Sequence, residues 1–173
     1  MFELVIPKDI GIDIDVPETG TTYDENAQIK AVTLMQASGL TTLADDSGLE
    51  VDALGGEPGI RSARYAGENA TDADRIAYLL AKIKDVPLEK RTARFVCVMA
   101  IAEPKGKIHL CRGICQGVIN QEPRGDSGHG YDPVFYLPKL AKTMAELPMG
   151  VKNEISHRGQ AAKKAREILM KLV

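Results

Sequence analysis

The stretch Leu43-Ala44-Asp45-Asp46-Ser47-Gly48-Leu49 decides the fold class of this chain. An apolar run over residues 42–44 predicts a short buried strand that ends at two adjacent carboxylates. Ligands of open α/β folds bind beyond the carboxyl ends of strands, so this stretch is a candidate functional site. If the extended geometry continues, Asp45 and Asp46 point to opposite faces. The alternative is an Asp-Asp-Ser-Gly turn whose carboxylates only accept hydrogen bonds from backbone N–H groups.

Length and composition limit the class of protein. A chain of 173 residues predicts one domain, over residues 1–173. A hydrophobic content of 44% and a net charge of −2 are typical of a globular protein without a basic surface for nucleic acid. The sequence contains no apolar run of membrane-spanning length and no basic leader, so we expect a cytoplasmic protein with no membrane partner. Cys97, Cys111 and Cys115 lack a Cys-x-x-Cys pair, which favours buried reduced thiols.

The remaining pattern predicts alternating helices and strands. Strand-like runs occupy residues 1–6, 94–101 and 108–119, and the last two suggest antiparallel pairing within a mixed sheet. One helix begins after Thr22, which forms a capping box with Glu25, and it ends at Gly39. A second helix begins after Thr71, and a third follows Ser156. We therefore predict an α/β fold.

Chemistry-bearing residues gather in three clusters. The first is acidic, spans residues 18–46 and contains Lys30; the second is a glycine-aromatic loop over residues 128–132. The third, over residues 152–158, is basic and lies at a helix start, which suits an anion or a carbonyl-bearing base. A solvated surface is the alternative for the third cluster, and a plain surface loop is the alternative for the second.

These clusters, in this order, resemble the inosine/xanthosine triphosphate pyrophosphatase family. The matching segments are Glu18-Thr19-Gly20-Thr21-Thr22, Glu25-Asn26-Ala27, Leu43 to Leu49 as quoted above, Ala53-Leu54-Gly55-Gly56, Pro58-Gly59, Ser62-Ala63-Arg64-Tyr65, residues 128–132 and Ser156-His157-Arg158-Gly159. The resemblance implies a single domain of two lobes, with an elongated mixed β-sheet flanked by helices and a central active-site cleft. It also implies a homodimer that hydrolyses aberrant purine nucleoside triphosphates (ITP, dITP, XTP) to the monophosphate and pyrophosphate.

The resemblance assigns roles to particular residues. Asp46 would be the general base and a Mg²⁺ ligand, and Glu18 would be the second metal ligand. Ser47 and Lys30 would contact phosphates, and the nucleotide pocket would consist of His129, Gly130, Tyr131, Asp132, Lys152, His157 and Arg158. Chemistry agrees with these roles, because triphosphate hydrolysis needs a divalent ion, cations and an oriented water. Donors at His157 and Arg158 would favour a 6-oxo purine over adenine.

The chain departs from the family pattern at three places. By comparison with the family, we expect its N-terminal strand and its phosphate-binding turn to be missing, which makes a nucleotide-binding but catalytically impaired member the main alternative. Arg61 stands where an aromatic residue is common, and His129 stands where Phe is common. A second alternative is a different Mg²⁺-dependent phosphohydrolase that acts on an ordinary nucleotide.

Overall fold

The computed structural model describes residues 3–172, and its centre is a five-stranded antiparallel sheet. The strands are β1 (Thr42–Val51), β2 (Thr92–Ala102), β3 (Ile108–Ile119), β4 (Phe135–Leu137) and β5 (Lys142–Thr143), in that spatial order. The α/β prediction is confirmed, but the prediction of a mixed sheet is wrong. The long connection that leaves the C-terminal end of β1 comes back to the same end, where β2 begins. Val51 therefore pairs with Ala93, and the two strands run antiparallel.

The strand β1 is longer than the sequence pattern suggested. It continues through Asp45 and Asp46 to Val51, and Asp46 pairs with Val98 of β2. The strand therefore does not end at the two carboxylates, and the Asp-Asp-Ser-Gly turn is excluded. The cross-strand pairing keeps the segment extended, so the alternation of side chains persists along it.

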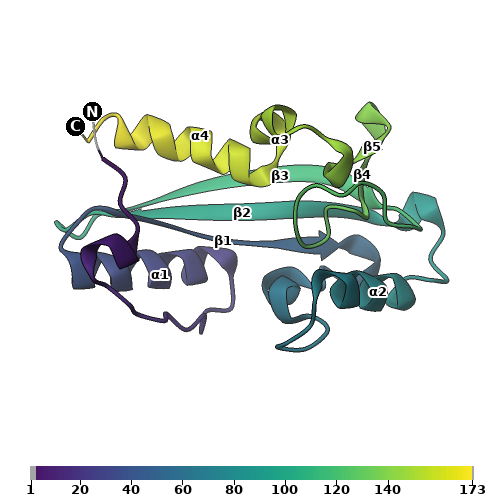
Figure 1. Cartoon of the computed structure of the whole chain (residues 1–173), viewed down its shortest axis with the longest axis horizontal. Coiled ribbons are helices and arrows are strands. Elements are labelled where there is room, and N and C mark those ends of the chain that lie inside the picture. The colour runs from purple at the N-terminus through teal and green to yellow at the C-terminus, as the bar shows by residue number, and fades with distance from the viewer. Residues whose placement is uncertain (1–2, 173) are drawn as a thin grey trace.

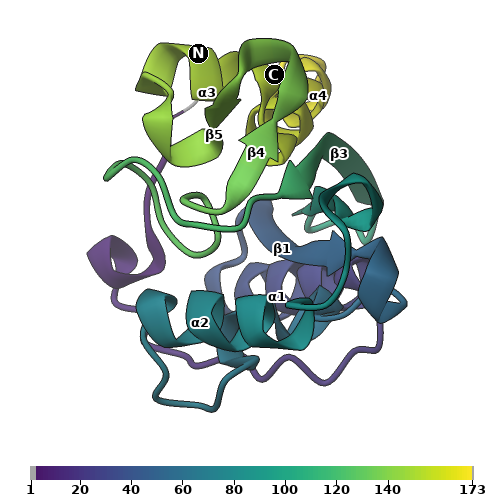
Figure 2. The same cartoon turned by 90° about the vertical axis from the view of Figure 1, so that its right-hand side faces the viewer.

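Helices cover both faces of the sheet. The helix α1 (Tyr23–Ser38) packs on one face and α4 (His157–Leu169) on the other, with α3 (Met149–Ile155) next to α4, as Figures 1 and 2 show. The helix α2 (Asp72–Lys82) lies beyond the end of β1 (Figure 1). Side-chain oxygens of Thr22, Thr71 and Ser156 cap α1, α2 and α4, which confirms the three predicted helix starts.

The apolar core is divided by the alternation of the strands. Small residues of α1 pack against Val96 and Val98, whereas Ala161 and Ala165 of α4 pack against Cys97 and Cys111 from the opposite face. A third cluster joins α2 to the ends of β1 and β2 and contains, among others, Leu49, Leu79, Phe95 and Phe135. All three cysteines are free and buried, as predicted.

The predicted strand at the N-terminus is not formed. Residues 3–6 are irregular, and Leu4 and Ile6 are exposed; Met1 and Phe2 lie outside the described residues. A strand needs a neighbour for its backbone groups, and residues 3–6 pair with none of β1 to β5. Within residues 3–172, no helix is long and apolar enough to cross a membrane.

Candidate active site

The two adjacent aspartates of β1 belong to different surroundings. Asp46 points to the face that α1 covers, where it contacts side chains of that helix. Asp45 and Ser47 point to the other face, where both contact Arg158 at the start of α4. Since β1 is an edge strand of the sheet, the two groups of contacts flank one sheet edge. The predicted opposite orientation of Asp45 and Asp46 is confirmed.

An acidic cluster forms around the ammonium group of Lys30. The Lys30 Nζ donates to Glu18 Oε1 at 2.9 Å and to Asp46 Oδ1 at 3.4 Å. Asn26 Nδ2 donates to the other oxygen, Asp46 Oδ2, at 3.2 Å. The structure thus brings together Glu18, Lys30 and Asp46, which stand far apart in the sequence, and fixes both carboxylate oxygens of Asp46.

Burial and charge shift the proton affinities in this cluster. Burial raises the pKa of Asp46 above its ordinary value, and the positive charge of Lys30 opposes that rise. For Lys30, burial disfavours the ammonium, but the hydrogen bond to Glu18 and the charge of Asp46 prevail and raise its pKa. The ammonium therefore remains charged near neutral pH, and the Asp46 carboxylate is a better proton acceptor than an exposed one.

A second cluster, on the other face of β1, is held by Arg158. Its Nη2 lies 3.0 Å from both Asp45 Oδ2 and Ser47 Oγ, and its Nη1 lies 3.3 Å from His129 Nε2. Ser47, expected beside the phosphates, is therefore on the face opposite Lys30. Arg158 remains half-exposed and lines a small cavity of about 220 Å³ together with Ser47, His129, Gly130, Tyr131, Asp132 and His157.

His157 is buried and forms one wall of this cavity. Its ring stacks on Phe95, with centroids 4.7 Å apart and planes 16° from parallel. Burial, followed by the charges of Arg158 and His129, lowers the pKa of His157 to about 4. Its Nδ1 atom is buried and has no hydrogen-bond partner within residues 3–172. His157 is therefore a neutral ring near pH 7, and the alternative of a solvated surface is wrong for it.

The glycine-aromatic loop is anchored to the core. The buried Tyr131 donates its hydroxyl to the carbonyl of Ser62 at 3.0 Å, and Asp132 accepts from Lys152 Nζ at 3.1 Å. Lys152 is also buried and lies on α3, a short helix that the sequence pattern did not predict. These residues adjoin the Arg158 cavity and a neighbouring one of about 400 Å³, so the plain surface loop is excluded.

The acidic cluster suits a magnesium ion that is shared with a phosphorylated ligand. Within residues 3–172, no group of three or more His, Cys, Asp or Glu side chains could hold a metal alone. Glu18 and Asp46 nevertheless both reach the Lys30 ammonium, which shows that their oxygens converge on one cation position. Magnesium commonly uses one or two carboxylates plus substrate phosphates, so this donor set fits.

Sequence reasoning assigned no role to several residues of the site. Asn26 holds Asp46, Phe95 stacks on His157, and Arg64 Nη1 lies 3.5 Å from Glu18 Oε2. Asn26 and Arg64 stand in segments that carry the family resemblance, and no other feature of the sequence pointed to a functional role for them. No feature of the sequence pointed to a functional role for Phe95, because an apolar residue in a strand is indistinguishable from an ordinary core residue.

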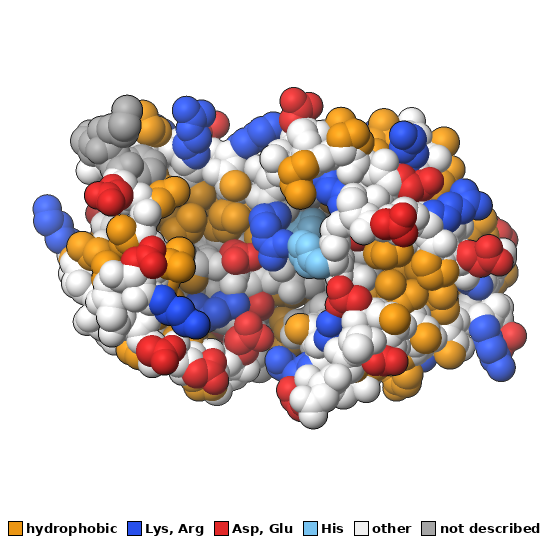
Figure 3. Space-filling model, in the orientation of Figure 1, with side chains coloured by type: hydrophobic (Ala, Val, Ile, Leu, Met, Phe, Trp, Pro, Cys, Tyr) orange, Lys and Arg blue, Asp and Glu red, His pale blue; other side chains and the backbone are white. Residues whose placement is uncertain are grey.

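Figure 3 shows charged side chains and a histidine around a hollow in the middle of the molecule.

Two carboxylates with cations beside an aromatic-walled cavity are typical of proteins that act on phosphorylated ligands. Comparison with known proteins gives the family. The Ham1 family model matches residues 1–168, and the chain belongs to that family. The expectation of a missing N-terminal strand is not borne out, whereas the missing phosphate-binding turn stays a prediction.

Relatives agree with this assignment. The chain is 54% identical over 158 residues to a protein of Desulforamulus reducens named dITP/XTP pyrophosphatase, covering 91% of this chain and 79% of the relative. A protein of the same name from Geobacillus kaustophilus is 53% identical, with 88% and 75% covered. The solved Staphylococcus aureus Ham1 protein has a TM-score of 0.89 and 45% identity, with 96% and 85% covered. The resemblance stated above is confirmed.

Proposed function

We propose that this protein hydrolyses the aberrant purine nucleoside triphosphates ITP, dITP and XTP to the monophosphate and pyrophosphate, which removes them from the nucleotide pool. The observation that carries the proposal is the pair of clusters on the two faces of edge strand β1. One holds Asp46, Glu18 and Lys30, and the other holds Arg158 beside the neutral ring of His157. The relatives named dITP/XTP pyrophosphatase support it.

The acidic cluster binds the phosphate chain of the substrate. Glu18 and Asp46 would hold Mg²⁺, which would supply positive charge to the phosphate oxygens. Lys30 contributes a second charge from α1. Asp46 orients the attacking water, because Asn26 fixes its side chain and Lys30 lies beside it. The attack at the α-phosphorus releases pyrophosphate.

The Arg158 cluster serves the base. Arg158 and the backbone N–H groups at the start of α4 are donors, and a 6-oxo group of hypoxanthine or xanthine is an acceptor. A 6-amino group would leave these donors unpaired, which costs binding energy in a closed pocket. Ser47, His129, Gly130, Tyr131, Asp132, Lys152 and His157 shape this pocket. We expect discrimination against ATP by orders of magnitude.

The proposal also covers the oligomeric state and the cellular compartment of the protein. We expect a homodimer that works in the cytoplasm, where the nucleotide pool is kept. Size-exclusion chromatography with light scattering measures the mass directly, and a mass equal to a single 18.7 kDa chain would reject the dimer.

Pyrophosphate release, coupled to an inorganic pyrophosphatase, tests the activity. ITP, XTP, dITP and ATP are compared at equal Mg²⁺ concentration, and release from the first three alone is expected. Comparable turnover of ATP would reject the base preference. Binding of ITP without release would favour the catalytically impaired alternative, and orthophosphate release would favour a different phosphohydrolase.

The variant Asp46→Asn tests the catalytic assignment. It removes the base while keeping the shape of the side chain, so kcat should fall by at least about a hundredfold while ITP binding is retained. The matched control is Asp52→Asn, directly after the same strand, where the side chain pairs with Arg94 outside the cluster. Retained turnover in Asp46→Asn would overturn the assignment.

A further inference from the structure

The carboxylate of Glu18 lies between two cations that come from different elements. On one side, Lys30 Nζ of α1 lies 2.9 Å from Oε1. On the other, Arg64 Nη1 lies 3.5 Å from Oε2. Arg64 is the last residue of the 3₁₀ helix Gly59–Arg64, which follows β1 in the chain. Both oxygens of the proposed metal ligand Glu18 are thus neutralised by protein side chains.

The two ion pairs differ in strength. Lys30 is hydrogen-bonded to Glu18 and also reaches Asp46, which anchors its ammonium in the cluster. The Arg64 pair is longer, and its two side chains are 34% and 31% exposed, so solvent screens it and it is easily broken. Arg64 is therefore the cation that can leave Glu18 at little cost.

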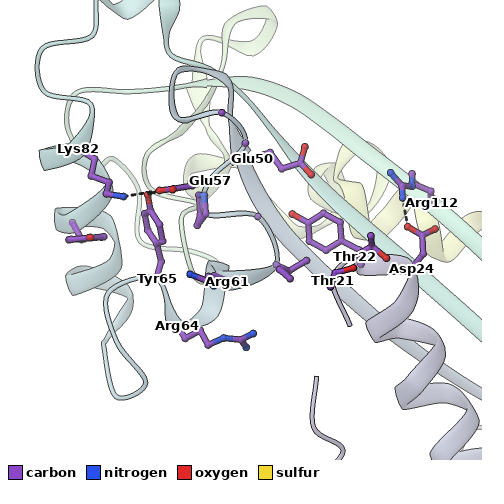
Figure 4. A pocket seen from close by; sticks show the side chains of 17 residues that line it. Thr21, Thr22, Asp24, Glu50, Glu57, Arg61, Arg64, Tyr65, Lys82 and Arg112 are labelled. Atoms are coloured by element: carbon purple, nitrogen blue, oxygen red, sulfur yellow. Dashed lines mark hydrogen bonds and ion pairs between the residues drawn. The ribbon is translucent and has the colours of Figure 1, made fainter. Parts of the chain in front are cut away.

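Arg64 also borders open space. It lines a cavity of about 720 Å³ between the start of α1 and α2, together with Arg61 and Lys82 (Figure 4). Lys82 already forms an ion pair with Glu57, since its Nζ lies 2.7 Å from Glu57 Oε2. The guanidinium of Arg64 is planar and carries several N–H donors, which matches the oxygens of a phosphate group.

We propose that Arg64 is an exchangeable counter-ion, which neutralises Glu18 in the metal-free protein and binds a phosphate of the substrate's leaving pyrophosphate once the carboxylate takes a divalent ion. The proposal rests on the proposed function of the acidic cluster. It adds a residue that binds phosphate only in the metal-loaded state, and it couples metal binding to phosphate binding through one side chain.

The variant Arg64→Ala tests this exchange with two binding measurements of opposite expected sign. Binding of Mn²⁺ to the nucleotide-free protein, followed by electron paramagnetic resonance, should tighten by about two- to fivefold because a competitor for Glu18 is gone. Binding of pyrophosphate in the presence of Mg²⁺, followed by calorimetry, should weaken by about tenfold or more because a charge-assisted contact is lost. A residue that merely positions Glu18 would weaken both.

Two further variants control for charge and shape. Lys84→Ala removes a positive charge at an exposed position outside this cavity, where Lys84 lies 4.0 Å from Asp85, and should change neither binding constant by more than twofold. Arg64→Lys should restore part of the pyrophosphate affinity. Unchanged or weaker Mn²⁺ binding in Arg64→Ala overturns the inference, as does unchanged pyrophosphate binding or an equal effect of Lys84→Ala. If wild-type protein binds Mn²⁺ and pyrophosphate as expected but does not hydrolyse ITP, only the proposed function fails.

Discussion

At the scale of single residues, burial separates side chains of the same type. Asp46 is buried beside an ammonium and an amide, whereas its neighbour Asp45 is partly exposed and pairs with a guanidinium. His157 and His129 lie in one cavity, but only His157 is enclosed by the core and stacked on Phe95. The chemistry available to each group therefore follows from its surroundings more than from its type.

The protonation of His157 predicts a pH-dependent stability. Its folded-state pKa of about 4 is below the ordinary value of 6.5, so the unfolded chain takes up a proton first as the pH falls. The contribution of neutral His157 to the free energy of unfolding is complete above about pH 6.5 and is lost toward pH 4. About 2 kcal/mol of it is lost between pH 7 and pH 5. Urea unfolding at both pH values measures it. The variant His157→Gln should lose less stability than wild type by that amount, and equal losses would refute the assignment.

At the scale of elements, the placement of α4 on the sheet sets the position of Arg158. Gly113 of β3 lies under the first turn of this helix, and a Cβ at that position would be 2.0 Å from the carbonyl oxygen of His157 and 2.7 Å from the nitrogen of Ala161. Ser156 caps the same turn. The close backbone approach that only glycine permits thus brings His157 and Arg158 to the edge of the sheet.

The variant Gly113→Ala should move the start of α4 away from β3. Overpacking of this kind destabilises a protein by about 2 kcal/mol, and we expect a reduced turnover of ITP as Arg158 shifts from Asp45. Gly150→Ala is the control, since Gly150 lies in α3 with no heavy atom within 4 Å of an added Cβ, and it should be neutral or slightly stabilising. Thermal unfolding and steady-state rates measure both effects. Wild-type stability in Gly113→Ala would contradict the packing argument.

At the scale of the whole molecule, the candidate site is assembled from distant parts of the chain. Glu18 comes from the loop before α1, Asp46 from β1, Lys152 from α3 and Arg158 from α4. The sheet holds these parts in place through helices on both faces (Figures 1 and 2). Since the acidic cluster is neutralised by Lys30 and Arg64, the fold needs no metal for its charge balance.

Removal of divalent ions should therefore separate activity from stability. We expect EDTA to abolish pyrophosphate release from ITP while the Tm changes by less than about 3 °C, because two carboxylates do not make a structural metal cage. Re-addition of Mg²⁺ should restore the rate. Differential scanning calorimetry with and without EDTA checks the stability, and a large loss of Tm would show that a bound ion supports the fold.

The sequence by itself determined the family, the three helix starts and the residue types of the site. Capping at Thr22, Thr71 and Ser156 is local chemistry, so a short window of sequence suffices to predict it. The order of the motifs along the chain was equally informative about the family, because motif order can be compared without knowing the three-dimensional structure. The strict alternation of side chains along a strand also correctly separated Asp45 from Asp46.

Only the tertiary structure decided the direction of the strands, the length of β1 and the partners within the site. The antiparallel register depends on where the connection after Val51 returns, and the extended Asp45-Asp46 segment depends on pairing with β2. The contact of Arg64 with Glu18, the stacking of Phe95 on His157 and the place of Ser47 beside Arg158 join residues far apart in the chain. Such contacts arise from packing between elements, which no local pattern in the sequence encodes.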